Sequence, residues 1–152
     1  MNDAEFLADQ LKRAYQGEAW HGPSLWELMT GVTAEQAGAK PIPGAHSIWE
    51  LVMHTAAWLC AVRRRMAGEL AELSPQEDWP RVDGGSEAAW QQALAALAEE
   101  QNQLALAISA LPENSLKKGV PGRKYSVRFM LEGVTQHVLY HAGQIALLKK
   151  MV

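Results

Sequence analysis

The sequence has little of what would tie a protein to secretion or to a membrane. Cys60 is the only cysteine, so no disulfide forms within the chain. No apolar run approaches the roughly 20 residues that a transmembrane helix needs. The first residues are polar and lead into a helical pattern without the apolar core of a signal peptide. We therefore expect a cytoplasmic protein with no membrane partner.

An excess of positive charge is also missing. The 152 residues include 14 Lys and Arg against 17 Asp and Glu, which gives a formal net charge of −3. Nucleic acids attract basic surfaces, so we expect no nucleic-acid partner and instead a small-molecule substrate. The one basic run, 63–65, is interpreted as the solvated end of a helix. Hydrophobic residues make up 48% of the chain, enough for one globular domain over residues 1–152.

Strand-like alternation is absent, and four long segments instead carry helical patterns. Their apolar residues recur at spacings of three and four, which places them on one face of a helix. The segments start at capping signals and stop at glycine or proline; they are expected at about 3–16, 47–67, 86–111 and 126–150. Seams with a mean spacing of 3.5 predict an all-α fold, a four-helix bundle.

The connections between these segments are long. In the first, Ser24 and Thr33 are candidate caps of short helical turns. Residues 69–85 form a linker marked by prolines and glycines, and 117–125 is expected to be a small hairpin or an extended loop. The lengths of the first two connections leave the direction of successive helices open.

Three histidines fall on the apolar seams. His137 and His141 are one turn apart on the last helix, and His54 occupies an equivalent inward position on the second. Imidazole nitrogens at an i, i+4 spacing can bind one ion, and a third nitrogen leaves a fourth position open, as in catalytic sites. With no thiolate ligand apparent, zinc, nickel and iron are all compatible. The alternative is that the three are core histidines that satisfy other buried polar groups.

Other patterns of known chemistry are missing. The residues between His137 and His141 lack the glutamate of a zinc peptidase motif. No Ser-His-Asp arrangement, phosphate-binding glycine loop or dinucleotide fingerprint is found. A bound ion is therefore the best source of reactivity that the sequence offers.

A few more residues are candidates for a role near such an ion. His21, in the first connection, is a candidate proton donor or acceptor if its loop covers the bundle. Gln101 and Gln144 lie at seam positions and are candidate hydrogen-bond partners of a metal ligand or of a metal-bound water. The alternative for both is a polar side chain at a solvated end of the bundle. Tyr125 precedes the last helix and either overhangs a pocket or only packs. Cys60 lies well off the His54 direction and is interpreted as a small packing residue.

Two motifs carry a resemblance to a known family. Residues 44–54 (GAHSIWELVMH) resemble the second-helix motif, and residues 137–145 (HVLYHAGQI) the last-helix motif, of the DinB/YfiT-like superfamily. Residues 20–25 (WHGPSL) resemble the first connection in one branch. The similarity spans most of the chain, and the pattern of His54 with His137 and His141 is its specific part.

The resemblance implies a four-helix bundle that holds a divalent metal, often zinc or nickel, on those three histidines. Relatives include S-transferases that use a low-molecular-weight thiol and thiol-dependent isomerases, so an S-transferase-like enzyme is the leading expectation. A metal-dependent hydrolase and a non-catalytic metal-binding or stress-response bundle are the alternatives. A homodimer is left open, because exposed faces of long helices often pair.

Overall fold

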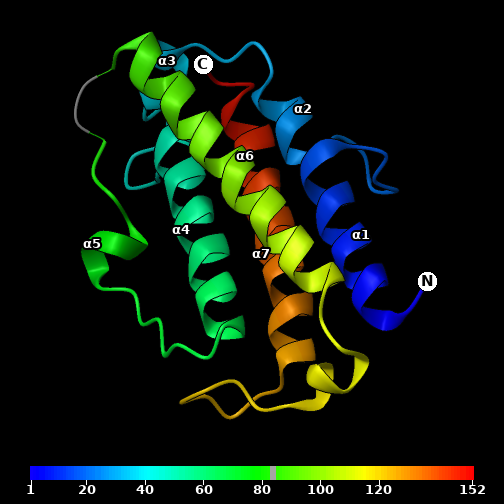
Figure 1. Cartoon of the computed structure of the whole chain (residues 1–152). Helices are drawn as coiled ribbons and strands as arrows, with labels where there is room; N and C mark the ends of the chain where they lie inside the picture. The colour runs from blue at the N-terminus through cyan, green and yellow to red at the C-terminus, as the bar shows by residue number, and fades with distance from the viewer. Residues whose placement is uncertain (83–84) are drawn as a thin grey trace.

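The computed structural model describes residues 1–82 and 85–152, and it is all-α, with its long helices in one bundle (Figure 1). The four long helices are α1 (Asp3–Gln16), α4 (Ile48–Met66), α6 (Glu87–Ser109) and α7 (Val127–Leu148). The shorter elements lie in the connections: α2 (Leu25–Met29), α3 (Ala34–Gly38), α5 (Pro75–Asp78) and the 3-10 helix η1 (Glu113–Lys117). The predicted all-α four-helix bundle is confirmed.

The predicted caps are the caps of the structure. The side chains of Ser24, Thr33 and Ser47 each accept a hydrogen bond from the backbone N–H three residues on, within full capping boxes. Ser86 and Ser126 cap α6 and α7 through the same hydrogen bond from the backbone N–H three residues on, without a full capping box. Short polar side chains thus decide where each helix begins, because they satisfy N–H groups that have no partner inside the helix.

The linker and the last connection are only partly as predicted. Residues 69–85 are predicted to be a linker, and within it the structure has a short helix, with Ser74 as the cap of α5 and Pro75 in its first turn. Residues 83–84 of this range lie outside the described residues. Residues 117–125 do not form a hairpin ladder; one isolated antiparallel bridge joins Gly119 to Ser126. The extended-loop alternative describes that connection better.

The long helices are arranged so that α4 contacts α6 and α7, and α1 contacts the same two. The long helices α1 and α4, which follow each other in the chain apart from short elements, are therefore diagonal in the bundle, and so are α6 and α7. The chain must cross the bundle between the members of each pair, which accounts for the long connections between α1 and α4 and between α6 and α7. Helices α4 and α6 run in the same direction (Figure 1). The chain between them must return along the whole bundle, and α5 lies on that return path beside α4.

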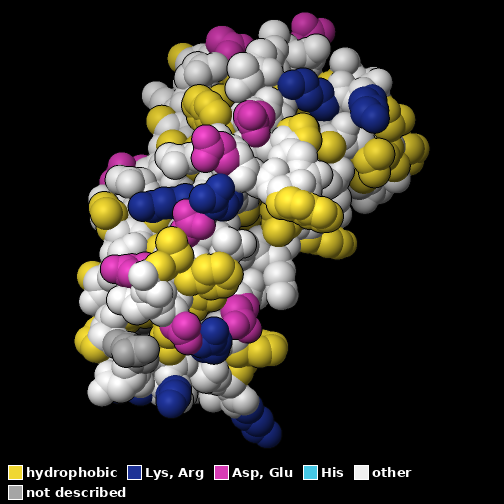
Figure 2. Space-filling view, turned by 90° about the vertical axis from the view of Figure 1, so that its right-hand side faces the viewer, with side chains coloured by type: hydrophobic (Ala, Val, Ile, Leu, Met, Phe, Trp, Pro, Cys, Tyr) yellow, Lys and Arg dark blue, Asp and Glu magenta, His cyan; other side chains and the backbone are white. Residues whose placement is uncertain are grey.

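The core is formed by the predicted seams. Leucine is the commonest of its largest fully buried side chains, which also include Trp90 and Ile145. On the face that includes α1, basic side chains are interspersed with acidic and apolar ones (Figure 2). No helix among the described residues is both long enough and apolar enough to cross a bilayer.

Candidate metal centre

The three seam histidines converge between α4 and α7. Nε2 of His137 lies 3.1 Å from Nε2 of His54 and 3.0 Å from Nε2 of His141. One ligand atom from each side chain lies within 4.8 Å of the other two. Three nitrogens that bind one ion tetrahedrally at 2.0–2.1 Å are about 3.3 Å apart, so the two separations from His137 are close to what an ion requires. The expected convergence is therefore present.

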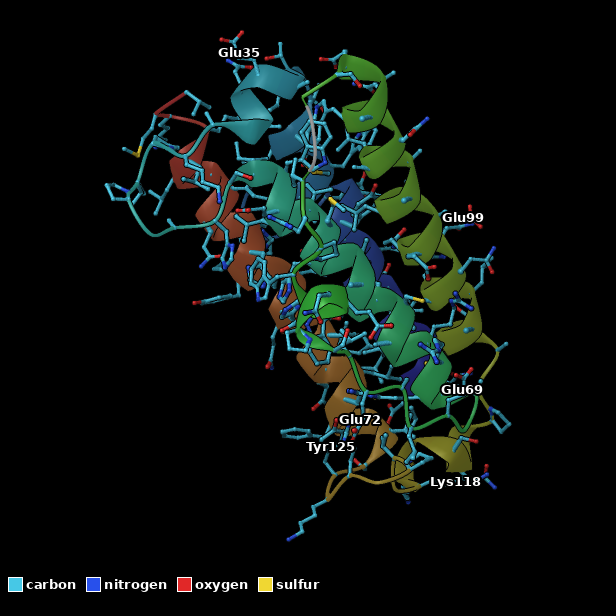
Figure 3. The ribbon with its side chains drawn as sticks, turned by 90° about the vertical axis from the view of Figure 1, so that its left-hand side faces the viewer. Glu35, Glu69, Glu72, Glu99, Lys118 and Tyr125 are labelled. Carbon is cyan, nitrogen blue, oxygen red and sulfur yellow. The ribbon has the colours of Figure 1, made fainter. Side chains whose placement is uncertain are left out.

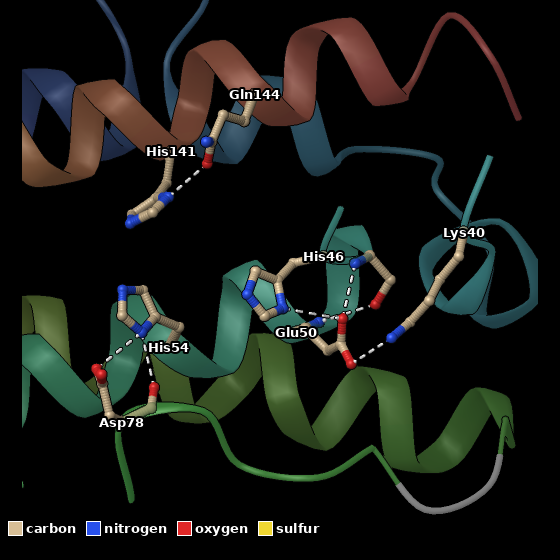
Figure 4. A network of polar contacts seen from close by, with 8 residues as sticks. Lys40, His46, Glu50, His54, Asp78, His141 and Gln144 are labelled. Carbon is tan, nitrogen blue, oxygen red and sulfur yellow. Dashed lines mark hydrogen bonds and ion pairs between the residues drawn. The ribbon is translucent and has the colours of Figure 1, made fainter. Parts of the chain in front are cut away.

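His54 is oriented by the linker. Its Nδ1 lies 2.7 Å from the backbone carbonyl oxygen of Asp78 and 3.1 Å from the Oδ1 atom of the same residue (Figure 4). A carbonyl only accepts, so Nδ1 carries the proton and the lone pair of His54 is on Nε2. Asp78 Oδ1 also accepts from Nε1 of Trp58 at 2.7 Å, which fixes the carboxylate.

His141 is oriented within its own helix. Its Nδ1 donates to Oε1 of Gln144 at 2.7 Å, three residues along α7 (Figure 4). The Nε2 atom of His141 therefore also presents a lone pair toward His137. Gln144 thus contacts a candidate ligand, the first of the two roles considered for it, and holds the ring as outer partners of metal-binding histidines do.

Protonation does not resolve the resulting crowding of lone pairs. Burial lowers the pKa of His54, of His141 and most of all of His137, where burial and the two neighbouring histidines bring it to about 4. The contact of His54 with Asp78 is thus a hydrogen bond from a neutral ring rather than an ion pair. If Nε2 of His137 carries a proton, it can donate to Nε2 of His54 or of His141, and the lone pair of the other histidine is left without a donor. The Nδ1 atom of His137 is buried and has no hydrogen-bond partner among the described residues. Neutral nitrogen donors that converge in this way fit a divalent cation.

Stacked aromatic rings form one wall of the site. The indole of Trp79 lies flat between two imidazoles, with ring centroids 3.8 Å from His54 and 3.5 Å from His46. His46 Nδ1 in turn lies 3.3 Å from Glu50 Oε2, within the capping box of α4 (Figure 4). The stack limits rotation of the His54 ring.

A cavity of about 420 Å³ adjoins the triad. Side chains from α4 and α7 line it, together with Asp78 and Tyr125. Figure 3 shows Tyr125 at the end of the bundle where α7 begins. Tyr125 thus borders the pocket, the first of the two roles considered for it. The apolar lining is Trp58, Val62, Phe129, Met130 and Val134. The volume suits a small molecule.

The structure does not bring every candidate to this cavity. His21 is exposed and lines a separate hollow with Thr135 and Leu139. Gln101 is 1% exposed within the core and is not among the cavity residues, so neither role considered for it applies. Cys60 lies outside the cavity, and its half-buried thiol has a raised pKa, mainly through burial and then the nearby Glu100 carboxylate. It remains a packing residue.

Three residues of the site escaped the sequence reasoning. Asp78 and Trp79 lie in the linker, where only the Ser74 capping signal with Pro75 pointed to ordered structure. Arg65 belongs to the basic run that the sequence predicts to be a solvated helix end, and the structure instead shows it buried and lining the cavity. Its spacing of 11 residues from His54 is three helical turns, which places both on one face of α4 and could have revealed it.

One of three comparisons with known proteins identifies a family. A family model described as the DinB superfamily matches residues 19–145, which include all three histidines. No curated protein and no solved structure matches the chain. The match covers well over half of the sequence, and the chain therefore belongs to the DinB superfamily.

Proposed function

We propose that the protein is a metal-dependent enzyme in which His54, His137 and His141 hold one divalent ion, with zinc, nickel and iron as the candidate metals. The observation that carries the proposal is the convergence of three neutral Nε2 atoms beside a small-molecule cavity. Three neutral ligands leave the full charge of the ion to act on a fourth ligand. When bound, the ion would lower the pKa of a thiol or a water, so that a nucleophile forms near neutral pH.

The protein side chains bind and orient rather than attack. Asp78 and Gln144 hold the proton on Nδ1 of His54 and of His141 and so keep both Nε2 atoms available. Among the described residues that line the cavity there is no serine, threonine, cysteine or lysine. The carboxylate of Asp78 is held by Trp58 and His54, so a nucleophile that enters with the substrates is favoured over a side chain of the lining. The favoured one is a low-molecular-weight thiol: its sulfur would lose its proton to solvent and form a bond to the electrophilic carbon of the second substrate, whose leaving group would depart with the bonding electron pair.

The proposal is tested with protein purified without a metal-affinity tag. Elemental analysis should find about one divalent ion per chain. The loaded protein is then assayed with a panel of thiols and electrophiles, and with esters and amides. Thiol transfer that disappears in His54→Ala supports the proposal. Metal-dependent hydrolysis without thiol transfer would make the protein a hydrolase, and a chain that binds no divalent ion is not the enzyme proposed.

A further inference from the structure

Arg65 differs from the two arginines before it. Arg63 pairs with Glu100 at 3.1 Å and Arg64 pairs with Glu69 at 2.8 Å, both at the surface of the bundle. Arg65 is 6% exposed, and none of the described carboxylate side chains lies within ion-pair distance of it. Burial of an unneutralised charge is costly, so an arginine kept in this state calls for a reason.

The guanidinium of Arg65 is held only by neutral groups. Nη2 donates to the carbonyl oxygen of Ala71 at 3.0 Å, and Nη1 lies 3.5 Å from the Tyr125 hydroxyl. Its central carbon lies 5.3 Å from the centroid of the Trp58 ring. Its Nε is buried and has no hydrogen-bond partner among the described residues. The cation therefore has a fixed position and an unused donor.

Trp58 lies between this cation and the candidate metal centre. Its ring centroid is 6.0 Å from that of His137 and 6.4 Å from that of His54, while Arg65 lies on the same indole. All four side chains line one cavity. A molecule that touches Arg65 at one end can follow the apolar wall of the cavity to the triad at the other.

The charges of the cavity indicate which anion fits. Among the described residues that line the cavity, Arg65 is the one arginine or lysine, and the one carboxylate, that of Asp78, instead contacts Trp58 Nε1 and His54 Nδ1. One positive charge matches a carboxylate, whereas a phosphate dianion would bring an unmatched negative charge into a largely apolar cavity. The planar guanidinium also suits the geometry of a carboxylate.

We propose that the cavity takes a substrate that carries a carboxylate, which binds Arg65, and an apolar body, which lies along Trp58 and presents its reacting group to the triad. The reacting end of this assignment rests on the function proposed above; the carboxylate end does not. The substrate class is thus small apolar carboxylic acids.

The test is a binding comparison that needs no turnover. We would titrate 4-phenylbutanoate, its uncharged amide and the matching phosphonate into zinc-loaded and zinc-free protein by calorimetry. The carboxylate should bind at least tenfold more tightly than the amide in both forms and more tightly than the phosphonate. Arg65→Gln should reduce its affinity to that of the amide. Arg123→Gln, which removes an equal charge that is paired with Glu72 outside the cavity, should leave it unchanged.

Three results would overturn the assignment. The first is equal affinity for the acid and the amide, and the second is a preference for the acid over the amide that survives Arg65→Gln. The third is a preference for the acid that is present in zinc-loaded protein and absent from zinc-free protein, which would place the carboxylate on the ion. If Arg65→Gln does not fold, as judged by circular dichroism, the wild-type protein gives the answer. The Nε–H resonance of Arg65 should then shift on addition of the acid and not of the amide, and an unmoved resonance contradicts the proposal. Zinc stoichiometry on the same samples separates failure of the metal centre from failure of the carboxylate site.

Discussion

Replacing Gln144 with alanine tests whether the outer hydrogen bonds prepare the triad for an ion. Among the described side chains, the substitution removes the one acceptor of His141 Nδ1, at 2.7 Å, and leaves all three candidate ligands in place. Without that acceptor, the neutral ring can place its proton on Nε2, where it blocks the lone pair, and the ring plane is less restrained.

The size of the effect follows from the hydrogen bond itself. A hydrogen bond between neutral groups contributes about 0.5–1.5 kcal/mol, and coordination polarises the donor, so the upper end applies. We expect a loss of about 1.4 kcal/mol in metal binding, or about tenfold in Kd. Gln144→Glu retains an acceptor and adds negative charge, so it should bind zinc at least as tightly as the wild type.

Competition with a chromophoric zinc chelator at constant pH measures these affinities. Gln136→Ala is the matched control, because it makes the same change on an exposed position of the same helix. If Gln144→Ala and Gln136→Ala bind zinc equally well, the hydrogen bond does not prepare the site, and the orientation argument fails.

Three further predictions follow from the same geometry. His137→Ala should abolish stoichiometric metal binding while far-UV circular dichroism stays close to that of the wild type, since the leucine seams stabilise the bundle without an ion; loss of helix on chelation of the wild type would contradict this. The pKa of His137 is about 4 in the fold and near 6.5 in an unfolded chain, so the unfolded state binds more protons between these values. Urea titrations of metal-free protein should show its stability falling as pH drops from 6.5 to 4, with a weaker decline in His137→Ala. Cys60→Ser should leave zinc affinity and any thiol-dependent rate unchanged, because that thiol lies outside the cavity and its pKa is raised; a loss of rate would identify Cys60 as the nucleophile.

The predictable part of this molecule is the part governed by local rules. Ser47 and Ser126 could be recognised as caps because the first backbone N–H groups of a helix need an acceptor, and a serine just before the helix supplies one to the N–H three residues on. The spacing of His137 and His141 fixed their common face, and the apolar seam around His54 placed it inward. These inferences need only the period of a helix and the cost of an unsatisfied polar group.

The rest of the site depends on contacts between residues far apart in the sequence, and the spacing of residues along one helix does not predict such contacts. Asp78 reaches His54 across 24 positions of sequence, through a linker whose path is set by the direction of α6. Gln101 shows the opposite failure, since its seam position was correctly inward but faces the core rather than the cavity. Arg65 was misjudged because its two neighbours are surface residues, although its own place on α4 shares a face with His54.

The direction of α6 also decides which linker residues reach the candidate site. If α6 ran antiparallel to α4, a short turn would join them at one end and no chain would pass the middle of α4. Because the two helices are parallel, the connection must return along the bundle, and it carries Asp78 and Trp79 to the side of His54. The same return brings Ala71 to the guanidinium of Arg65. One connection thus orients a candidate ligand at one end of the cavity and holds the buried cation at the other, while the core that stabilises the fold lies elsewhere. Changes to this linker should alter metal and substrate binding well before they alter the stability of the bundle.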